Sequence, residues 1–98
     1  MKAKALVSRR VAIGPGVFAE LVLWIVPEPV RGSRHSYKYR LALVANGICV
    51  LRYDNEAGKG DHKHIGREEL PYRFSNVDVL LDDFRSDVRK WLDENRHI

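Results

Sequence analysis

The hydrophobic positions of the chain form four strand-like runs followed by one helical stripe. The runs are rich in β-branched and aromatic residues, which favours strands at about residues 2–13, 17–26, 36–45 and 48–55. Glycine and proline at residues 14–16 separate the first two runs, and Pro27 ends the second because proline lacks an amide hydrogen. After residue 55 the strand pattern stops, which predicts a loop at about 56–74.

The third and fourth runs have the pattern of a hairpin. Asn46-Gly47 between them is the sequence that a two-residue type I′ turn prefers. In the register that such a turn sets, Ala45 faces Ile48 and Val44 faces Cys49. The same register places Arg40 opposite Tyr53 and Lys38 opposite Asn55, all on one side of the sheet.

The last part of the chain predicts a helix at about residues 76–95. Its hydrophobic residues recur at helical spacing and form one stripe, which is typical of packing on a sheet. The stripe consists of Val77, Leu80, Leu81, Phe84, Val88, Trp91 and Leu92. Ser75 is the expected N-cap, and Asp78 in the first turn favours the same start.

These elements predict an α+β fold: a four-stranded antiparallel β-meander with the C-terminal helix packed on one face. The 98 residues are enough for a single domain over 1–98 with its own core. The lone cysteine, Cys49, has no partner for an internal disulfide, and its apolar neighbours predict a buried side chain. An exposed sheet edge would allow a homodimer.

Charge and hydropathy limit the cellular location and the kinds of partner that we expect for the protein. The longest apolar run, residues 21–27, is too short to span a bilayer, and no signal peptide is evident, so we expect a cytoplasmic protein without a membrane partner. The net charge is +4. It is uneven, because residues 1–74 carry 13 Lys or Arg against 7 Asp or Glu. Such a surface attracts phosphates or an acidic partner, although ordinary solubility charge explains it equally well.

The loop that follows the hairpin, YDNEAGKGDHKH at 53–64, concentrates ionisable groups. His62 and His64 would point the same way in an extended segment, and a histidine pair can supply the acid and the base around a phosphodiester. Lys59 or Arg40 would stabilise the developing charge, and Tyr53 would position a base or phosphate. This predicts a metal-independent ribonuclease, because the RNA 2′-hydroxyl is then the nucleophile and no cofactor is needed.

Two alternatives to acid–base chemistry remain open for this loop. The histidines, with Asp61 or Asp54, could hold a divalent metal, which we rank lower because no further ligand cluster is present. They could also simply hydrogen-bond the loop in place, as a short edge strand at 62–65. The sequence Gly58-Lys59-Gly60 lacks the spacing of a nucleotide-binding P-loop and is typical of a flexible connection.

Basic and aromatic residues lie side by side at three places. Arg40, Arg52 and Arg73 neighbour tyrosines or phenylalanine, a combination that grips single-stranded nucleic acid by charge and stacking, and that is equally common at the rim of a small sheet. We expect Asp61, Asn55, Lys38 and Arg73 to bind the substrate. His35 and His97 receive no role.

Three segments, VPEPVRGSRHSYKYRLALV, VLRYDNEAGKGDHKH and EELPYRF, resemble the TumE-type toxin family of bacterial toxin–antitoxin systems. The resemblance covers nearly the whole chain and is most specific in YDNE-x-GKGDH-x-H and PYRF. It implies a small cytoplasmic toxin with a cognate antitoxin of the helix-turn-helix type. It carries no catalytic residues over, so the roles above rest on the residues themselves.

The expected function is therefore a toxin that acts on RNA. The alternative is a non-catalytic module that binds nucleic acid or protein and is neutralised by its antitoxin.

Overall fold

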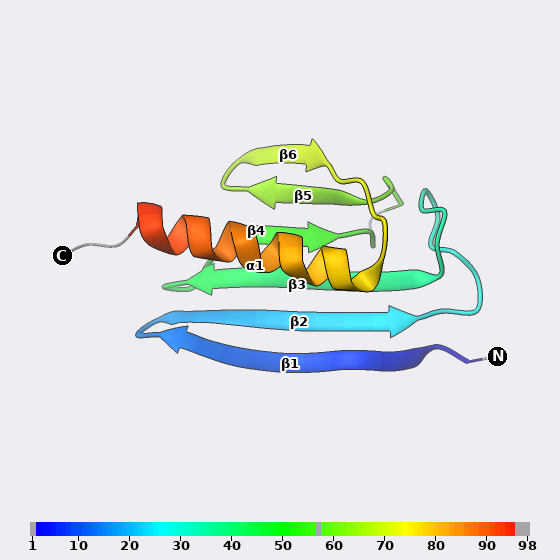
Figure 1. Ribbon diagram of the computed structural model, residues 1–98, viewed down its shortest axis with the longest axis horizontal. Helices are drawn as coiled ribbons and strands as arrows, with labels where there is room; N and C mark the ends of the chain where they lie inside the picture. Colours follow the sequence, from blue (N-terminus) through cyan, green and yellow to red (C-terminus); the bar gives the residue numbers. More distant parts are fainter. Residues whose placement is uncertain (1, 57, 96–98) are drawn as a thin grey trace.

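The computed structural model describes residues 2–56 and 58–95. Six strands precede one helix: β1 (Lys4–Gly14), β2 (Val17–Ile25), β3 (Tyr37–Ala45), β4 (Ile48–Asp54), β5 (His62–Ile65), β6 (Glu68–Pro71) and α1 (Val77–Glu94). The strands form one antiparallel sheet in chain order, so each pairs with its neighbours in sequence (Figure 1).

The α+β prediction is confirmed, but the strand count of four is wrong. The segment predicted as a loop at 56–74 contains β5 and β6, which extend the sheet beyond β4. The alternation of hydrophobic and polar residues that marks a strand is missing here. Strand β5 has the sequence His-Lys-His-Ile, with polar side chains on both sides of the sheet. The short strand expected as an alternative at residues 62–65 is present as β5, but it is not at the edge of the sheet. Strand β6 pairs with it and forms the edge.

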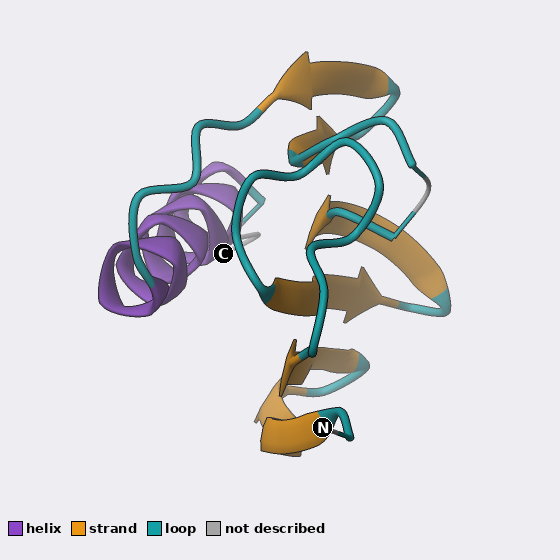
Figure 2. Cartoon of the chain, turned by 90° about the vertical axis from the view of Figure 1, so that its right-hand side faces the viewer, coloured by secondary structure: helices purple, strands orange, loops and turns teal. Residues whose placement is uncertain are grey.

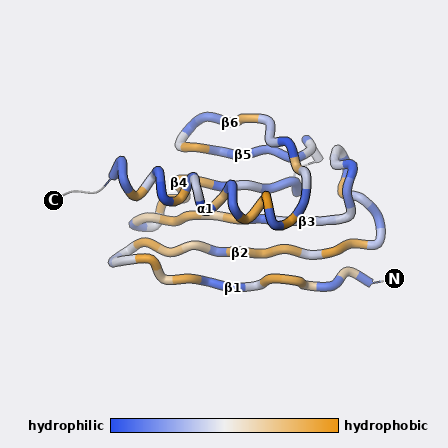
Figure 3. Tube along the Cα trace, in the orientation of Figure 1, coloured by the Kyte–Doolittle hydropathy of each residue, from blue (hydrophilic) through white to orange (hydrophobic). Residues whose placement is uncertain are grey.

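The helix packs on one face of the sheet, and the other face carries no helix or strand among the described residues (Figure 2). Leu80 and Phe84 of α1 are buried against a core of strand side chains: Ala19, Leu23, Tyr39, Leu41, Leu43, Leu51 and Tyr53. Figure 3 shows that β2 is mainly hydrophobic, whereas hydrophobic and hydrophilic residues alternate along α1. An amphipathic helix of this kind buries its hydrophobic side against the sheet and exposes its polar side to solvent. No helix in the described ranges is long and apolar enough to cross a membrane.

The β3–β4 hairpin turns at Asn46-Gly47, as predicted, and both residues have positive φ. The predicted pairs Ala45–Ile48 and Val44–Cys49 are present. A β-bulge then shifts the register between Leu43 and Val44, so Arg40 lies opposite Asp54 and not Tyr53. Because successive side chains alternate between faces, this one-residue shift moves Tyr53 to the helix side of the sheet.

Two local predictions are also corrected. Cys49 is exposed and not buried, because it lies near the hairpin turn on the face that α1 does not cover. The N-cap of α1 is Asn76 and not Ser75: the Asn76 side chain accepts a hydrogen bond from the Val79 amide at 2.9 Å. Asparagine is as good a cap as serine, and the exposed first turn depends on it.

We predict that replacing Asn76 by alanine lowers the free energy of unfolding by about 1 kcal/mol, because the Val79 amide loses its partner. The matched substitution Ser75→Ala should change it by less than about 0.5 kcal/mol. Urea unfolding followed by circular dichroism measures both. Equal losses for the two variants would contradict this assignment of the cap.

Candidate functional site

The two histidines of β5 lie together on the open face, the face of the sheet that α1 does not cover. His62 and His64 are two residues apart in a strand and therefore point to the same side. Their rings are 5.0 Å apart, edge to face. Lys63 between them points to the helix side, where its Nζ lies 3.1 Å from the Asp87 carboxylate. The two imidazoles and the ammonium group of Lys63 therefore lie on opposite sides of β5.

A buried contact joins His62 to β4. Its Nε2 lies 2.8 Å from Oδ1 of Asp54, the residue paired with it across the two strands. Its Nδ1 lies 2.9 Å from the carbonyl oxygen of Gly60. The contact with Asp54 is a close approach and not an aligned hydrogen bond, because Oδ1 has no hydrogen-bond partner in the described residues. Asp54 and His62 are at most 6% exposed, so this polar contact is almost completely shielded from solvent.

Arg52 completes the contact from the same strand as Asp54. Its Nε lies 2.7 Å from Asp54 Oδ2, and in the β4–β5 ladder Arg52 is paired with His64. This contact is close but not aligned as a hydrogen bond, so Arg52 Nε is buried without a hydrogen-bond partner in the described chain. Arg52 therefore lies beside both Asp54 and the strand position of His64.

His64 differs from His62 in its surroundings. Burial, together with the positive charge of Arg52, lowers the pKa of His64 below its ordinary value of 6.5. The ring is therefore neutral near pH 7 and has a lone pair that can accept a proton. Its Nε2 is buried and has no hydrogen-bond partner in residues 2–56 and 58–95. The two imidazoles therefore have unlike surroundings, since the His62 ring contacts Asp54 and Gly60 and the His64 Nε2 contacts no hydrogen-bonding group among the described residues.

Two further predicted site residues lie on or beside this face. Arg40 of β3 is paired with Asp54 and is half-buried. Lys59 is exposed, and its Nζ lies 3.6 Å from Glu69, the β6 residue paired with His64. The structure therefore brings Arg40, Lys59, His62 and His64 to one side of the sheet, and adds Arg52 and Asp54.

Tyr53 lies on the opposite side from this group. Its hydroxyl donates to Asp87 and to the carbonyl oxygen of Asp83 in α1. The Tyr72 hydroxyl donates to the Asp83 carboxylate at 2.6 Å. Burial, followed by these carboxylate contacts, raises the pKa of both tyrosines, so their hydroxyls stay protonated and hold the helix on the sheet.

Asp61 lies in a separate network that holds two loops together. Its carboxylate accepts hydrogen bonds from Ser33 and Tyr39, at 2.6 and 2.7 Å, and lies 2.6 Å from His35 Nε2. Burial alone would raise the pKa of Asp61, but these three partners together lower it. The His35 ring also stacks on Phe74 at 3.8 Å. Sequence reasoning gave His35 no role because its partner is 26 residues away.

Asn55 belongs to the same network and is fully buried. It accepts from the Tyr39 amide and donates to Ser33 and to the Tyr37 carbonyl, so it links the end of β4 to the loop before β3. The remaining predicted substrate-binding residues lie apart from the histidines. Lys38 contacts Glu56 at 3.7 Å, and Arg73 is exposed between β6 and α1. His97, which received no role, lies outside the described residues.

Asp54, His62 and His64 form the one group of possible metal ligands within the described chain, with ligand atoms within 4.8 Å of one another. Two imidazoles and a carboxylate are a donor set that zinc and similar metals accept. The buried, unpartnered Asp54 Oδ1 and His64 Nε2 fit such a role. The guanidinium of Arg52, 2.7 Å from the same carboxylate, opposes it because it already supplies a positive charge there.

Comparison with known families decides the class of protein. A family model described as Toxin TumE matches residues 2–92. The chain belongs to the TumE toxin family. The match includes all six strands, the open-face histidines and most of α1, and membership implies a cognate antitoxin. The comparison with curated proteins gives no match. The comparison with solved structures gives none either.

We predict that the Asp61 network makes the stability of this TumE-family protein pH-dependent. The folded-state pKa of Asp61 lies below its ordinary value of 3.8, so the network stabilises the fold above that pH and loses this contribution as pH falls further. The difference in unfolding free energy between the wild type and Asp61→Asn should be largest at neutral pH and shrink below about pH 4.

Urea unfolding at a series of pH values measures this difference. Glu56→Gln is the matched control, because Glu56 is an exposed carboxylate of the same connection. A difference for Asp61→Asn that stays constant from neutral pH to about pH 3 would contradict the assignment.

Proposed function

We propose that this TumE-family toxin is a metal-independent ribonuclease whose reaction centre lies on the open face around His64. The observation that carries the proposal is the pairing of two imidazoles in unlike environments, 5.0 Å apart, beside two arginines. A neutral imidazole is the usual base for activating an RNA 2′-hydroxyl. Guanidinium groups suit the non-bridging phosphate oxygens, which gain negative charge in the pentacoordinate transition state of this reaction.

In this proposal His64 takes the proton from the 2′-hydroxyl, whose oxygen attacks the adjacent phosphorus as the bond to the 5′-oxygen of the next nucleotide breaks. The leaving 5′-oxygen takes a proton from solvent water, and the His64 ring returns its proton to the solvent. The products are a 2′,3′-cyclic phosphate and a 5′-hydroxyl. Arg40 and Arg52 stabilise the charge on the phosphate, and the exposed ammonium of Lys59 adds to it. His62 is 5% exposed, so we assign it with Asp54 to positioning rather than to contact with RNA.

The rest of the open face suits a single strand. Trp24 of β2 is 37% exposed and is paired with Lys38 of β3. Phe18, further along the same face of β2, has the Arg10 guanidinium 4.4 Å above its ring. Exposed aromatic rings beside cations bind single-stranded RNA by stacking and charge, without strong sequence preference. We therefore propose that Lys38 contributes to substrate binding. Separately, the resemblance to the TumE family leads us to propose that the cognate antitoxin is of the helix-turn-helix type.

We predict that His64→Ala lowers the rate of RNA cleavage about 100-fold or more, because the base is lost. Arg40→Ala should lower it about tenfold, because one cation near the phosphate is lost. The measurement is single-turnover cleavage of a labelled RNA, with mass analysis of the product ends. Arg67→Ala, at an exposed arginine in the turn between β5 and β6, is the control and should cleave at the wild-type rate.

The same assay with EDTA separates acid–base chemistry from a metal at Asp54, His62 and His64. Cleavage that persists in EDTA is the expected result. Cleavage that EDTA abolishes and zinc or manganese restores would contradict the metal-independent proposal. Undiminished cleavage by folded His64→Ala would contradict the role of His64.

A non-catalytic RNA-binding toxin is the second candidate. The burial of His62 and of His64 Nε2 favours it, because both groups could serve only to hold β5 in the sheet. In that case the purified protein binds RNA with an affinity that falls as salt rises, and the RNA remains intact.

A further inference from the structure

The single helix leaves part of the sheet on its own side uncovered. Six strands spaced by about 4.8 Å make a sheet roughly 24 Å wide, whereas one helix is about 10 Å across. Figure 1 shows α1 crossing over β3 and β4, with β1 and β2 beside it. Val11, Ile13 and Leu21 on this side of β1 and β2 are only half-buried. The core is therefore incomplete over the first two strands.

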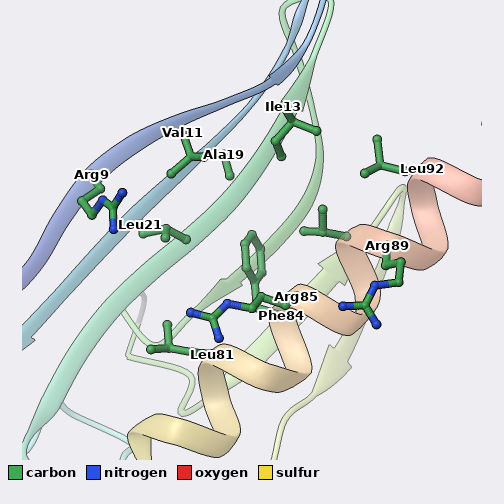
Figure 4. Close-up of a pocket in the computed structure, with 11 residues that line it drawn as sticks. Arg9, Val11, Ile13, Ala19, Leu21, Leu81, Phe84, Arg85, Arg89 and Leu92 are labelled. Carbon is green, nitrogen blue, oxygen red and sulfur yellow. The ribbon is translucent and has the colours of Figure 1, made fainter.

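A groove of about 460 Å³ lies at this place, between α1 and the first two strands (Figure 4). We call it the β1–α1 groove. Its floor is formed by the β1 and β2 side chains named above together with Ala19. Its wall is formed by one side of α1, from Leu81 through Phe84 and Val88 to Leu92. The groove is thus an elongated apolar surface about the size of a ligand pocket.

Three arginines line the β1–α1 groove, and no acidic residue is among the described residues that do so. Arg9 extends from β1, and Arg85 and Arg89 extend from α1, as Figure 4 shows. All three are exposed. Arg85 contacts Asp82 at 3.5 Å, but both side chains are largely exposed, so this pair holds the guanidinium only weakly. An apolar floor with a basic rim favours an apolar segment flanked by carboxylates.

The length and shape of the groove favour a helix as that segment. Leu81 and Leu92 are 11 residues apart on α1, which corresponds to roughly 16 Å or three helical turns. A second helix laid beside α1, at the usual spacing of about 8–10 Å, would cover the exposed side of β1 and β2. It would bury one apolar stripe, as α1 does, and place its acidic residues against the arginines.

We propose that the β1–α1 groove binds an acidic amphipathic helix of the cognate antitoxin. Membership of a toxin family implies such a partner. A second copy of this chain is a poorer occupant, because a symmetric dimer would bring the arginines of one groove against those of the other. The groove lies on the opposite face of the sheet from His64, so this helix anchors the antitoxin and does not itself cover the proposed reaction centre.

The test is isothermal titration of the purified chain with the purified antitoxin encoded beside it. Arg85→Glu with Arg89→Glu should weaken binding about tenfold or more and reduce its salt dependence. Arg34→Glu with Arg67→Glu is the matched control, since both arginines are exposed and neither lines the groove. The control pair should bind as the wild type does, which separates a local contact from a general effect of net charge.

Growth assays provide the second measurement. The Arg85→Glu and Arg89→Glu variant should remain toxic and escape neutralisation by co-expressed antitoxin, and this result holds whether or not the toxin cleaves RNA. Amide hydrogen exchange of the complex should show protection in β1, β2 and α1. Unchanged affinity, protection confined to the open face, or self-association of the chain through the groove would each overturn the proposal.

Discussion

The buried contact between Asp54 and His62 is the interaction on which the geometry of the candidate site depends. It joins the last residue of β4 to the first residue of β5, with 2.8 Å between carboxylate and ring, and both residues are almost fully buried. Removing one partner would leave the other as a buried polar group with fewer partners, which costs about 1–3 kcal/mol. The contact therefore reinforces the backbone pairing that holds β5 between β4 and β6. The position of β5 then places His64 on the open face and Lys63 under the helix.

A one-residue bulge decides which β4 side chains accompany the histidines. Without it, the hairpin register would place Tyr53 and Leu51 on the open face and send Arg52 and Asp54 to the core. With it, Arg52 and Asp54 join Arg40 on the open face, and Tyr53 bonds to α1. The two faces of the sheet therefore carry different side chains. One holds the helix through tyrosines and carboxylates, and the other gathers imidazole and guanidinium groups.

The sequence predicted those parts of the fold that depend on local periodicity and turn chemistry. The first four strands, the Asn-Gly turn and the amphipathic helix all follow from patterns within about 20 residues. The missing parts depend on tertiary contacts. Strands β5 and β6 have no hydrophobic alternation, and their place in the sheet depends on backbone pairing with β4 and with each other, together with the contact of Asp54 with His62. The bulge has no glycine to mark it, because the register shift falls among Leu43, Val44 and the start of β4. The sequence indicates Asp54 only as a possible metal ligand, because its contact with His62 depends on the β4–β5 pairing, which no local pattern predicts.

In the proposed function RNA binds to the open face of the sheet and not to the helix face. Nuclear magnetic resonance tests this directly, using a short single-stranded RNA whose 2′-hydroxyls are methylated so that it cannot be cleaved. Titration should shift the side-chain signals of His64 and Trp24 and the amides of β2 to β5, and leave those of Leu81, Val88 and the rest of α1 unchanged. Shifts confined to α1 and the β1–α1 groove, or no shifts at low salt, would contradict the account.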